Sequence, residues 1–377
     1  MTMDSKGGGI EAQQYVWGGA IPLQIHLHES EVTTLPPPPP ALILAPRVGY
    51  LPLLVPQIKP FFNSSLPPGV DTVWFEYKGL PLKWYIPTGT LFDLLCSEPE
   101  RPWNLTIHFR GYPVNLLIPC EGEDSVKWSF INALKEAAYI INGNCKNIMN
   151  MSQYDQTELW RSVLNGRLQH SKIRGRSFWL QHCQLEAYLR VYSKLKLDIV
   201  GDDFSLKLNT SRQSNAETDA IGTAKSGKIP VRLYVRSIDE DIDELEDAPI
   251  VDSWDKISYI NCPVEVRGEG KSFSLNDAIK ALLPALFAEE TSVDVDSQAA
   301  GSESGEGSDG GSSRSSQKNG ESSSARTGLF TDGAEIKLVR IQGIEPMLDI
   351  PFGWVVKNLV NPEQYLHICI YVKAVQP

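Results

Sequence analysis

The sequence lacks a long apolar run. No stretch approaches about eighteen consecutive apolar residues, and the opening MTMDSKGGG has no apolar core of the kind found in secretory signals. An excess of positive charge is also missing, since 35 Lys and Arg residues against 46 Asp and Glu residues give a formal net charge of −11. The first absence predicts a soluble, intracellular protein, and the second argues against a general nucleic-acid binder.

Motifs of known catalytic and metal centres are absent as well. There is no GxSxG, no P-loop, no HExxH and no GxGxxG following an expected strand. The six cysteines form no CxxC pair, which predicts buried, reduced thiols. His26 and His28 share one face of an expected strand, but no cysteine or carboxylate pattern accompanies them. We therefore expect no metal, no cofactor and no catalytic residues, so that the chain is not an enzyme by itself.

What the sequence does contain is an internal repeat. Each copy follows an apolar, strand-like run (residues 73–77 or 336–341) and precedes an alternating run (105–109 or 366–370). The repeat predicts two related modules of strand, short helix and closing strand. The positions that align at one constant offset are Gly79, Ile86, Pro87, Gly89, Leu91, Phe92 and Leu95 with Gly343, Ile350, Pro351, Gly353, Val355, Val356 and Leu359.

The segments before the first copy complete a recognisable order. Residues 21–28 alternate apolar and polar like a half-buried strand, prolines 36–40 form a stiff connection, and residues 41–44 return as a strand. Residues 50–62 have helical spacing that prolines interrupt, and residues 82–86 are expected to form a strand after the one that opens the repeat. The order of strand, strand, helix, strand, strand, short helix and strand is the β-grasp arrangement of ubiquitin.

The second module repeats this order. Residues 230–236 and 257–267 are expected strands, and residues 274–287 an expected helix with Ser274 as its N-cap. Ser and Gly dominate residues 289–333, which therefore predict a disordered insertion inside the module rather than a domain boundary. The acidic run 239–247 is expected to form a solvated hairpin loop.

The residues between the two modules are helix-biased and then polar. We therefore expect an α+β chain in which two ubiquitin-like β-grasp domains flank a helix-rich domain. The expected parts are an N-terminal helix and tail (1–19), a first ubiquitin-like domain (20–120), the helix-rich domain (121–198), a flexible linker (199–227) and a second ubiquitin-like domain (228–377).

One lysine of the helix-rich domain is placed for a protein contact. On an expected helix over residues 125–141, Lys135 points about 130° from the centre of the apolar stripe, at about 100° per residue, with Trp128 and Tyr139 close beside it. Such a lysine suits a protein contact or a covalent attachment, because a lysine amine accepts isopeptide bonds. An ordinary surface lysine is the alternative. The stripe consists of Val126, Phe130, Leu134, Ala137 and Ile141.

Long blocks of the sequence resemble the autophagy-related protein 5 family. They are VWGGAIPLQIHL, LAPRVGYLPLL, VWFEYKGLPLKWYIPTGTLFDLL, PWNLTIHF, FINALKEAAYI, GKIPVRLYVR and VRIQGIEPMLDIPFGWVVKNLVNPEQYLHICIYV, and they cover most of the chain outside the expected linkers. The resemblance implies two ubiquitin-like folds flanking a helix-rich middle. It also implies that Lys135, the lysine of the family's KEA motif, is joined to the C-terminal glycine of the ubiquitin-like modifier autophagy-related protein 12.

The resemblance implies further partners and a cellular location. The conjugate is expected to bind the coiled-coil autophagy-related protein 16 and to act as an E3-like factor in the lipidation of autophagy-related protein 8. It is expected to be cytoplasmic and to be recruited to the phagophore membrane. Trp128 and Tyr139 are expected to face the modifier. A short helix over residues 10–17 should dock across the two modules and form a groove for the coiled-coil partner, with Trp17 as an anchor and Val16 and Ile21 beside it.

Residues 167–184 depart from the family pattern and look like extra sequence. They carry Arg167, Lys172, Arg174 and Arg176, a basic patch that suits either a lipid headgroup or a solvated face. Two other function classes stay open. One is a tandem ubiquitin-like adaptor without covalent modification. The other is a thiol-transfer enzyme, for which no cysteine has an activating neighbourhood.

Overall fold

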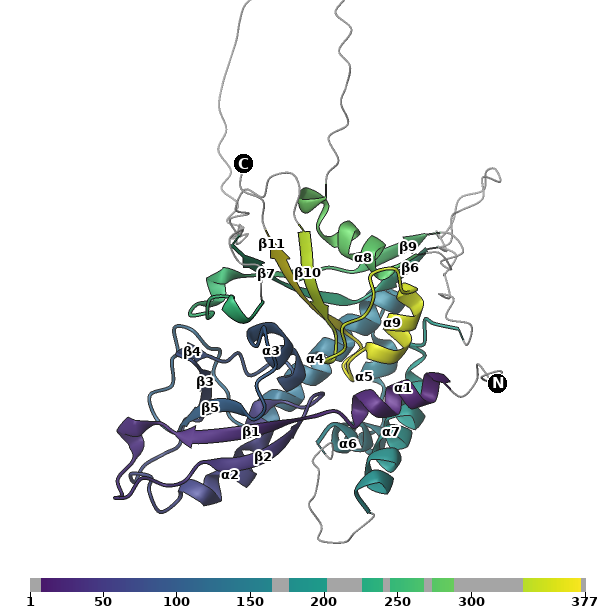
Figure 1. Cartoon of the computed structure of the whole chain (residues 1–377). Coiled ribbons are helices and arrows are strands. Elements are labelled where there is room, and N and C mark those ends of the chain that lie inside the picture. Colours follow the sequence, from purple (N-terminus) through teal and green to yellow (C-terminus); the bar gives the residue numbers. More distant parts are fainter. Residues whose placement is uncertain are drawn as a thin grey trace, which may run out of the picture.

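The computed structural model describes residues 8–164, 176–201, 226–239, 245–267, 273–287 and 335–373 (Figure 1). The expected disordered insertion 289–333, most of the expected linker 199–227 and much of the acidic run 239–247 lie outside these residues. The described ends of the linker correct its boundaries. Val200 is buried in the core of the second module, and strand β6 (Ser226–Ile229) begins before the expected domain start because its backbone pairs with β9 (Val264–Arg267).

The first module has the predicted β-grasp order. Its sheet has the strand order β2-β1-β5-β3-β4, with β1 parallel to β5 and antiparallel neighbours elsewhere. The alternation in the first strand is confirmed, since Ile21, Leu23, Ile25 and Leu27 are all buried. The elements are β1 (Ala20–Leu27), η1 (Glu29–Glu31), β2 (Ala41–Pro46), η2 (Leu51–Leu54), α2 (Val55–Phe62), β3 (Trp74–Tyr77), β4 (Leu80–Pro81), α3 (Thr88–Leu95) and β5 (Trp103–His108).

One strand of this module was predicted wrongly. Residues 82–86 do not form a strand, because β4 ends at Pro81 and the chain then turns, with the N–H of Ile86 bonded to the carbonyl of Lys83 at 3.1 Å. Pro81 and Pro87 bound the segment, and a proline has no N–H to donate to a strand ladder. The turn places Lys83, Trp84 and Tyr85 at the junction of the modules.

The middle of the chain forms the predicted helical module. Its long helix α4 (Glu123–Asn142) ends at Gly143, which adopts a left-handed conformation with φ 71°. The predicted apolar stripe of α4 is confirmed, because all five of its residues are buried. Its Phe130 packs in the same core as Trp160 and Tyr188. The other helices are α5 (Lys146–Met149), α6 (Gln153–Leu164) and α7 (Arg176–Leu195).

The second module has a four-stranded sheet in the order β10-β11-β7-β8, with β11 parallel to β7, and a separate ribbon of β6 and β9. The expected single strand over 257–267 is two strands, because Pro263 interrupts the ladder between them. The expected helix over 274–287 begins at the predicted N-cap Ser274 but ends at Leu282, before Pro284. The remaining elements are β7 (Val231–Ile238), η3 (Leu245–Asp247), η4 (Trp254–Lys256), β8 (Ile257–Asn261), α8 (Leu275–Leu282), η5 (Pro284–Leu286), β10 (Glu335–Arg340), α9 (Phe352–Leu359) and β11 (Leu366–Lys373).

The sequence repeat corresponds to the same local structure in both modules. Gly79 and Gly343 both turn the chain with positive φ, 88° and 75°, a region that favours glycine. Pro87 and Pro351 then occupy the N-cap positions of α3 and α9. The repeat therefore marks a glycine turn followed by a proline-led short helix in each ubiquitin-like module.

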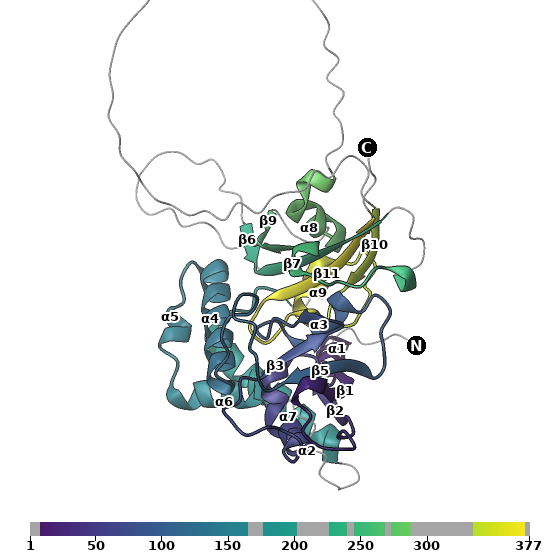
Figure 2. The same cartoon turned by 90° about the vertical axis from the view of Figure 1, so that its left-hand side faces the viewer.

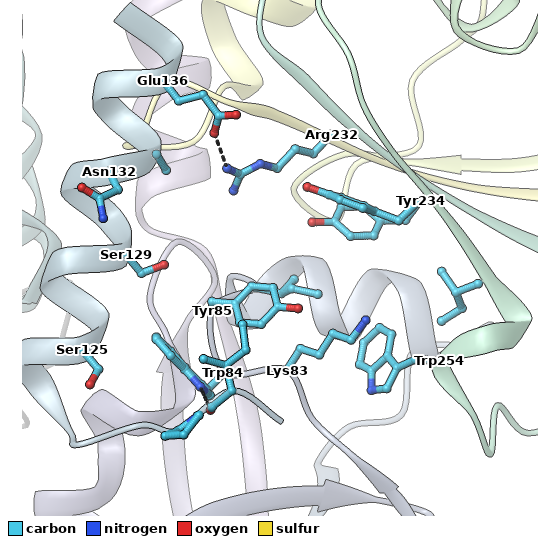
Figure 3. A pocket seen from close by; sticks show the side chains of 16 residues that line it. Lys83, Trp84, Tyr85, Ser125, Ser129, Asn132, Glu136, Arg232, Tyr234 and Trp254 are labelled. Atoms are coloured by element: carbon cyan, nitrogen blue, oxygen red, sulfur yellow. Dashed lines mark hydrogen bonds and ion pairs between the residues drawn. The ribbon is translucent and has the colours of Figure 1, made fainter. Parts of the chain in front are cut away.

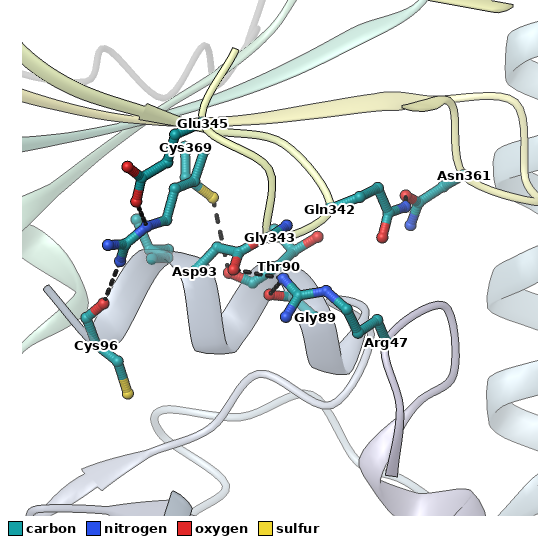
Figure 4. A network of polar contacts seen from close by, with 12 residues as sticks. Arg47, Gly89, Thr90, Asp93, Cys96, Gln342, Gly343, Glu345, Asn361 and Cys369 are labelled. Atoms are coloured by element: carbon teal, nitrogen blue, oxygen red, sulfur yellow. Dashed lines mark hydrogen bonds and ion pairs between the residues drawn. The ribbon is translucent and has the colours of Figure 1, made fainter. Parts of the chain in front are cut away.

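The two ubiquitin-like modules join at α3 (Figure 4), and the second module lies above the first in Figure 2, with the helical module alongside. Asp93 of α3 forms an ion pair with Arg47 of the first module. The same carboxylate accepts a hydrogen bond of 2.7 Å from the backbone N–H of Gly343 in the second module. A Cβ on Gly343 would lie 2.6 Å from Arg47 Cζ, so a side chain there would displace the guanidinium, and the positive φ of 75° also favours glycine.

The last turn of α3 is capped by side chains from the second module. Carbonyls at a helix C-terminus have no partner within the helix and need donors from elsewhere. The Tyr371 hydroxyl donates to the carbonyl of Leu94 at 2.9 Å, and Arg340 Nη1 donates to that of Cys96 at 2.7 Å. The carbonyls at the end of α3 in the first module therefore accept hydrogen bonds from side chains of the second module. These bonds fix the two modules relative to each other.

The N-terminal helix α1 (Gly8–Trp17) forms as predicted, and it docks on the helical module as well as on the second module. It contacts α9 of the second module and α7 of the helical module. Gln13 Nε2 donates to the carbonyl of Lys357 at 2.7 Å, and the Trp17 ring centre lies 4.7 Å from that of Tyr188. The expected docking on the second module is therefore present, and Trp17 packs beside a cluster that combines helical-module residues with Tyr50 and Trp84 of the first module.

Trp17→Ala is expected to loosen α1. Removing the half-buried indole from Tyr188 should lower the free energy of unfolding by about 1–3 kcal/mol, which is less than for a fully buried tryptophan. Limited proteolysis should then cut the N-terminal segment faster than in the parent chain. Tyr15→Ala is the matched control, because Tyr15 is 78% exposed on the same helix. Equal cleavage rates for the two variants would contradict this role of Trp17.

Deleting residues 289–333 and closing the gap with a short Gly/Ser link should leave the second module folded. The removed segment has few apolar residues, and the core forms from its flanks, where Leu286 packs in one cluster with Val339 and Ile341. We expect a thermal midpoint within a few degrees of the parent's, measured by circular dichroism. A control deletion that also removes β10 should abolish the cooperative transition. Loss of that transition in the shorter deletion would show that the segment is structural.

Candidate functional site

Helix α4 carries the predicted lysine between two exposed aromatic rings. Trp128, Lys135 and Tyr139 lie seven and four residues apart, so they share one side of the helix. Trp128 and Tyr139 are each 63% exposed, and Lys135 is half-buried between them. The structure therefore brings together the three residues that the sequence selected.

The amine of Lys135 has no acidic partner. Among the residues that the structure describes, Lys135 Nζ makes no ion pair and no side-chain hydrogen bond. The carboxylate next to it is turned elsewhere: Glu136 lies 3.4 Å from Arg232 Nη2 and accepts a hydrogen bond of 3.3 Å from Asn261. An amine without a carboxylate partner is free to act as a nucleophile once it has lost its proton.

All three modules line a cavity of about 720 Å³ beside this helix (Figure 3). Helix α4 provides one wall with two serines, an asparagine and Glu136, and the turn after β4 and the sheet of the second module provide the others. Most of the lining is aromatic or aliphatic, as in pockets that receive the apolar face of a partner. The lining residues are Lys83, Trp84, Tyr85, Ile86, Ile118, Pro119, Ser125, Ser129, Asn132, Ala133, Glu136, Arg232, Tyr234, Trp254, Ile257 and Tyr259.

Hydrogen bonds hold the aromatic walls of this three-module cavity in place. Trp84 Nε1 donates to the carbonyl of Ile118 and Trp254 Nε1 to that of Pro81, each at 2.8 Å. The second of these bonds crosses from the second module to the first. Each indole therefore presents its ring to the cavity while its N–H is satisfied, as buried indoles require.

Tyr234 and Arg232 of the cavity lining contact a buried polar network. His367 lies between Tyr234 and Glu363, with Nδ1 3.2 Å from the Tyr234 hydroxyl and Nε2 2.8 Å from Glu363 Oε1. Burial lowers the pKa of His367, although Glu363 acts in the opposite direction. Arg232 stacks 3.9 Å from the centre of the Tyr365 ring. These contacts fix Tyr234 and Arg232 at the cavity wall.

The lysine face and the cavity are neighbouring faces of one helix. The cavity row of α4 (Ser125, Ser129, Asn132 and Glu136) lies about 70° from the centre of the lysine face (Trp128, Lys135 and Tyr139), at about 100° per residue. One protein attached at Lys135 and another docked in the cavity would both contact α4. The helix is therefore the element on which two partners can meet.

Two predicted partner-binding residues are not available. Val16 is 3% exposed within the core of the second module and Ile21 is 2% exposed within that of the first. Their assignment to the coiled-coil partner is wrong, because both side chains face inward. Trp17 is half-buried beside a separate cavity of about 290 Å³ between α1, α7 and α9, and its role as an anchor remains a prediction.

Sequence reasoning missed the three-module cavity. Its walls come from segments far apart in the chain, so no local periodicity connects Tyr85, Glu136 and Trp254. A signal was present in the adjacent aromatic residues Trp84 and Tyr85, which we placed on a strand. Two large aromatic side chains in a turn bounded by prolines are better explained by a contact surface than by a strand.

The cysteines are only partly as predicted. Cys96 and Cys369 are buried, and burial raises the pKa of the Cys96 thiol to about 12. Cys262 is exposed, which contradicts the prediction of buried thiols for that residue, because it follows the last residue of the edge strand β8. Cys183 has no described side chain.

Three further sequence predictions concern metals and membranes. Within the described ranges, no group of three or more His, Cys, Asp or Glu side chains is placed to hold a metal ion, and the His28 ring stacks on His108 with centres 4.3 Å apart. No helix among the described residues is long and apolar enough to cross a bilayer. The side chains of the basic segment 167–184 lie outside the described part of the chain.

The fold and the site define a class of protein in which two ubiquitin-like modules flank a helical bundle in the sequence and pack directly against each other. Three family models match the chain in that order: "Autophagy protein ATG5, UblA domain" at residues 16–109, "alpha-helical bundle region" at 123–170 and "UblB domain" at 228–370. The chain therefore belongs to the autophagy protein 5 family and has a role in autophagy.

Individual relatives support this assignment over almost the whole length. Autophagy protein 5 of Arabidopsis thaliana is 57% identical over 371 residues, covering 97% of this chain and 99% of the relative. The protein of the same name from Oryza sativa subsp. indica is 52% identical over 381 residues, covering 98% and 96%. The crystal structure of Kluyveromyces marxianus Atg5 shares the fold with a TM-score of 0.56 at 19% identity, covering 96% of this chain and 99% of that one.

Proposed function

We propose that this chain is a non-catalytic scaffold of the autophagy conjugation system and that Lys135 carries the ubiquitin-like modifier autophagy-related protein 12. The observation that carries the proposal is the position of Lys135, whose amine has no ionic partner among the described residues and lies between two exposed aromatic rings. Trp128 and Tyr139 offer apolar surface for a folded modifier tethered by its C-terminus.

The attachment is an acyl transfer to nitrogen. The deprotonated amine of Lys135 attacks the carbonyl carbon of a thioester at the C-terminal glycine of the modifier. A C–N bond forms, the C–S bond breaks, the thiolate leaves with the electron pair, and the amine proton passes to solvent or to the thiolate. The chain supplies only the nucleophile, so the activating chemistry belongs to other proteins.

We propose that the coiled-coil partner autophagy-related protein 16 docks an amphipathic helix in the three-module cavity. Its aromatic lining and size suit the apolar face of a helix, and the predicted alternative at Val16 and Ile21 is buried. The assembled complex then acts as an E3-like factor for the lipidation of autophagy-related protein 8. The chain is cytoplasmic in this proposal and reaches the phagophore membrane through the complex.

The experiment that tests the proposal locates the covalent bond. The full chain is incubated with the modifier, its activating and conjugating enzymes and ATP, and the products are separated under denaturing and reducing conditions. We expect an adduct that survives both, and a branched peptide in mass spectrometry with glycine on Lys135. A branch on another lysine would move the site. Absence of any adduct would favour the tandem ubiquitin-like adaptor, which binds its partners without a covalent bond.

A further inference from the structure

Not every charged side chain that lines the three-module cavity has an ion-pair partner. On the α4 side, Glu136 is paired with Arg232 (Figure 3). On the other side stands Lys83, which makes no ion pair with any residue in the described ranges. The cavity therefore presents one cation without an anion, on the wall away from α4.

Lys83 is held in position by an aromatic ring. Its Nζ lies 4.5 Å from the centre of the Trp254 ring, a cation–π contact, and Trp254 is itself fixed by its hydrogen bond to the carbonyl of Pro81. Figure 3 shows the ammonium directed along the cavity wall toward this indole. A lysine held in this way loses less side-chain entropy on binding an anion than a free surface lysine does.

The surroundings of Lys83 favour an incoming carboxylate. Burial lowers the pKa of Lys83, and the charge of Asp255 opposes this effect. Asp255 is itself exposed and bonded to Ser253, beyond ion-pair distance from Lys83. Partial burial also weakens solvent screening, so an acidic group that reaches Lys83 gains more than it would at an open surface.

We propose that Lys83 selects the docking partner by charge, binding a carboxylate on the flank of the partner's helix that faces away from α4. The inference rests on the proposed function, because it takes the coiled-coil partner's helix as the occupant of the cavity. The apolar face of the helix then covers Tyr85 and Tyr234, and the Glu or Asp at its edge pairs with Lys83. This pattern also fixes which flank of the helix faces α4.

The test compares Lys83→Met, Lys83→Glu and the control Lys78→Glu in the full chain. Lys78 belongs to the same module but lies outside the cavity, paired with Glu100 at 2.6 Å. The probe is the purified coiled-coil partner, with affinity measured by calorimetry. Lys83→Met should weaken binding by about tenfold, Lys83→Glu by about a hundredfold, and Lys78→Glu by less than about twofold.

A charge exchange identifies the carboxylate. Each Asp and Glu of the partner's helix is replaced in turn by Lys, and one such variant should bind Lys83→Glu at least about tenfold more tightly than the unchanged partner does. Replacing the same acidic residue of the partner with a neutral one should weaken its binding to the parent chain. The same replacement should not weaken its binding to Lys83→Met any further. If no partner variant shows this coupling, or if Lys83→Met binds like the parent, the role of Lys83 is overturned.

Ser129→Trp separates this failure from a failure of the proposed function. The indole would fill the cavity from the α4 wall, where Ser129 points inward (Figure 3). If Ser129→Trp leaves affinity unchanged, the partner docks elsewhere and both proposals fail at this cavity. If Ser129→Trp abolishes binding while the Lys83 variants bind like the parent, only the inference about Lys83 fails. The thermal midpoints of the variants should match that of the parent chain. If the midpoint of Lys83→Glu falls, its loss of binding could come from partial unfolding, and the comparison of Lys83→Met with the parent decides the test.

Discussion

Lys135→Arg is expected to eliminate the covalent adduct completely while leaving the fold intact. Arginine keeps the positive charge and most of the length, so the exchange at this half-buried surface position should cost under about 0.5 kcal/mol. The guanidinium stays protonated at physiological pH and does not attack a thioester. Denaturing electrophoresis should therefore show the parent adduct and no adduct from the variant, and both chains should have the same thermal midpoint.

The matched control is Lys127→Arg on the same helix. Lys127 is also half-buried on α4, but it lies two turns before Lys135 and on a different side. Its replacement should leave the adduct at the parent level. An undiminished adduct in Lys135→Arg would place the attachment elsewhere, and a loss in both variants would indicate that α4 recruits the conjugating enzyme through its basic side chains.

Asp93→Ala is expected to separate the two ubiquitin-like modules. Asp93 is 3% exposed, pairs with Arg47 and accepts the N–H of Gly343, so its loss leaves the 8%-exposed Arg47 as a buried cation without an anion. Removing one partner of a buried pair costs about 3–5 kcal/mol, and we expect a fall of that size in the free energy of unfolding by urea titration. Because the cavity forms where the modules meet, binding of the coiled-coil partner should weaken as well.

Two comparisons check this account of the interface. Asp252→Ala removes an exposed carboxylate, paired with Lys256 at 2.8 Å, and should leave the unfolding transition unchanged. The double variant Arg47→Met with Asp93→Leu should recover part of the lost stability, because it removes both buried charges. A cooperative transition in Asp93→Ala that matches the parent's would show that the modules are held together mainly by apolar packing.

The features that the sequence predicted correctly are those set by interactions between residues a few positions apart. The alternation of Ile21, Leu23 and Ile25 follows from the two-residue period of a strand, and the stripe on α4 follows from the helical period. The position of Lys135 opposite that stripe was predictable for the same reason. The repeat of Gly79 at Gly343 was readable because both turns need a positive φ, which glycine adopts without strain.

The errors arose where burial depends on a distant segment. Val16 was assigned to the partner because it lies beside Trp17 in a short terminal helix, yet residues of the second module cover it. Ile21 was assigned to the partner as well, although the strand alternation already placed it on the buried face. Likewise the segment 82–86 had the alternation expected of a strand, but the prolines on either side have no N–H to donate to a strand ladder. The segment forms a turn that lines the cavity instead. Apolar character is a property of the residue, whereas the surface that covers it is a property of the fold.

The sequence alone determined the two β-grasp modules, the helix between them and the lysine on that helix, because periodicity, turn chemistry and capping act over short distances. Only the tertiary structure decided that α3 is capped by Arg340 and Tyr371, that Arg47 fits against Gly343, and that three modules enclose a cavity with Lys83 on its wall. Those contacts join residues hundreds of positions apart, and they form because helix-end carbonyls and buried charges must find partners wherever the packed modules place them.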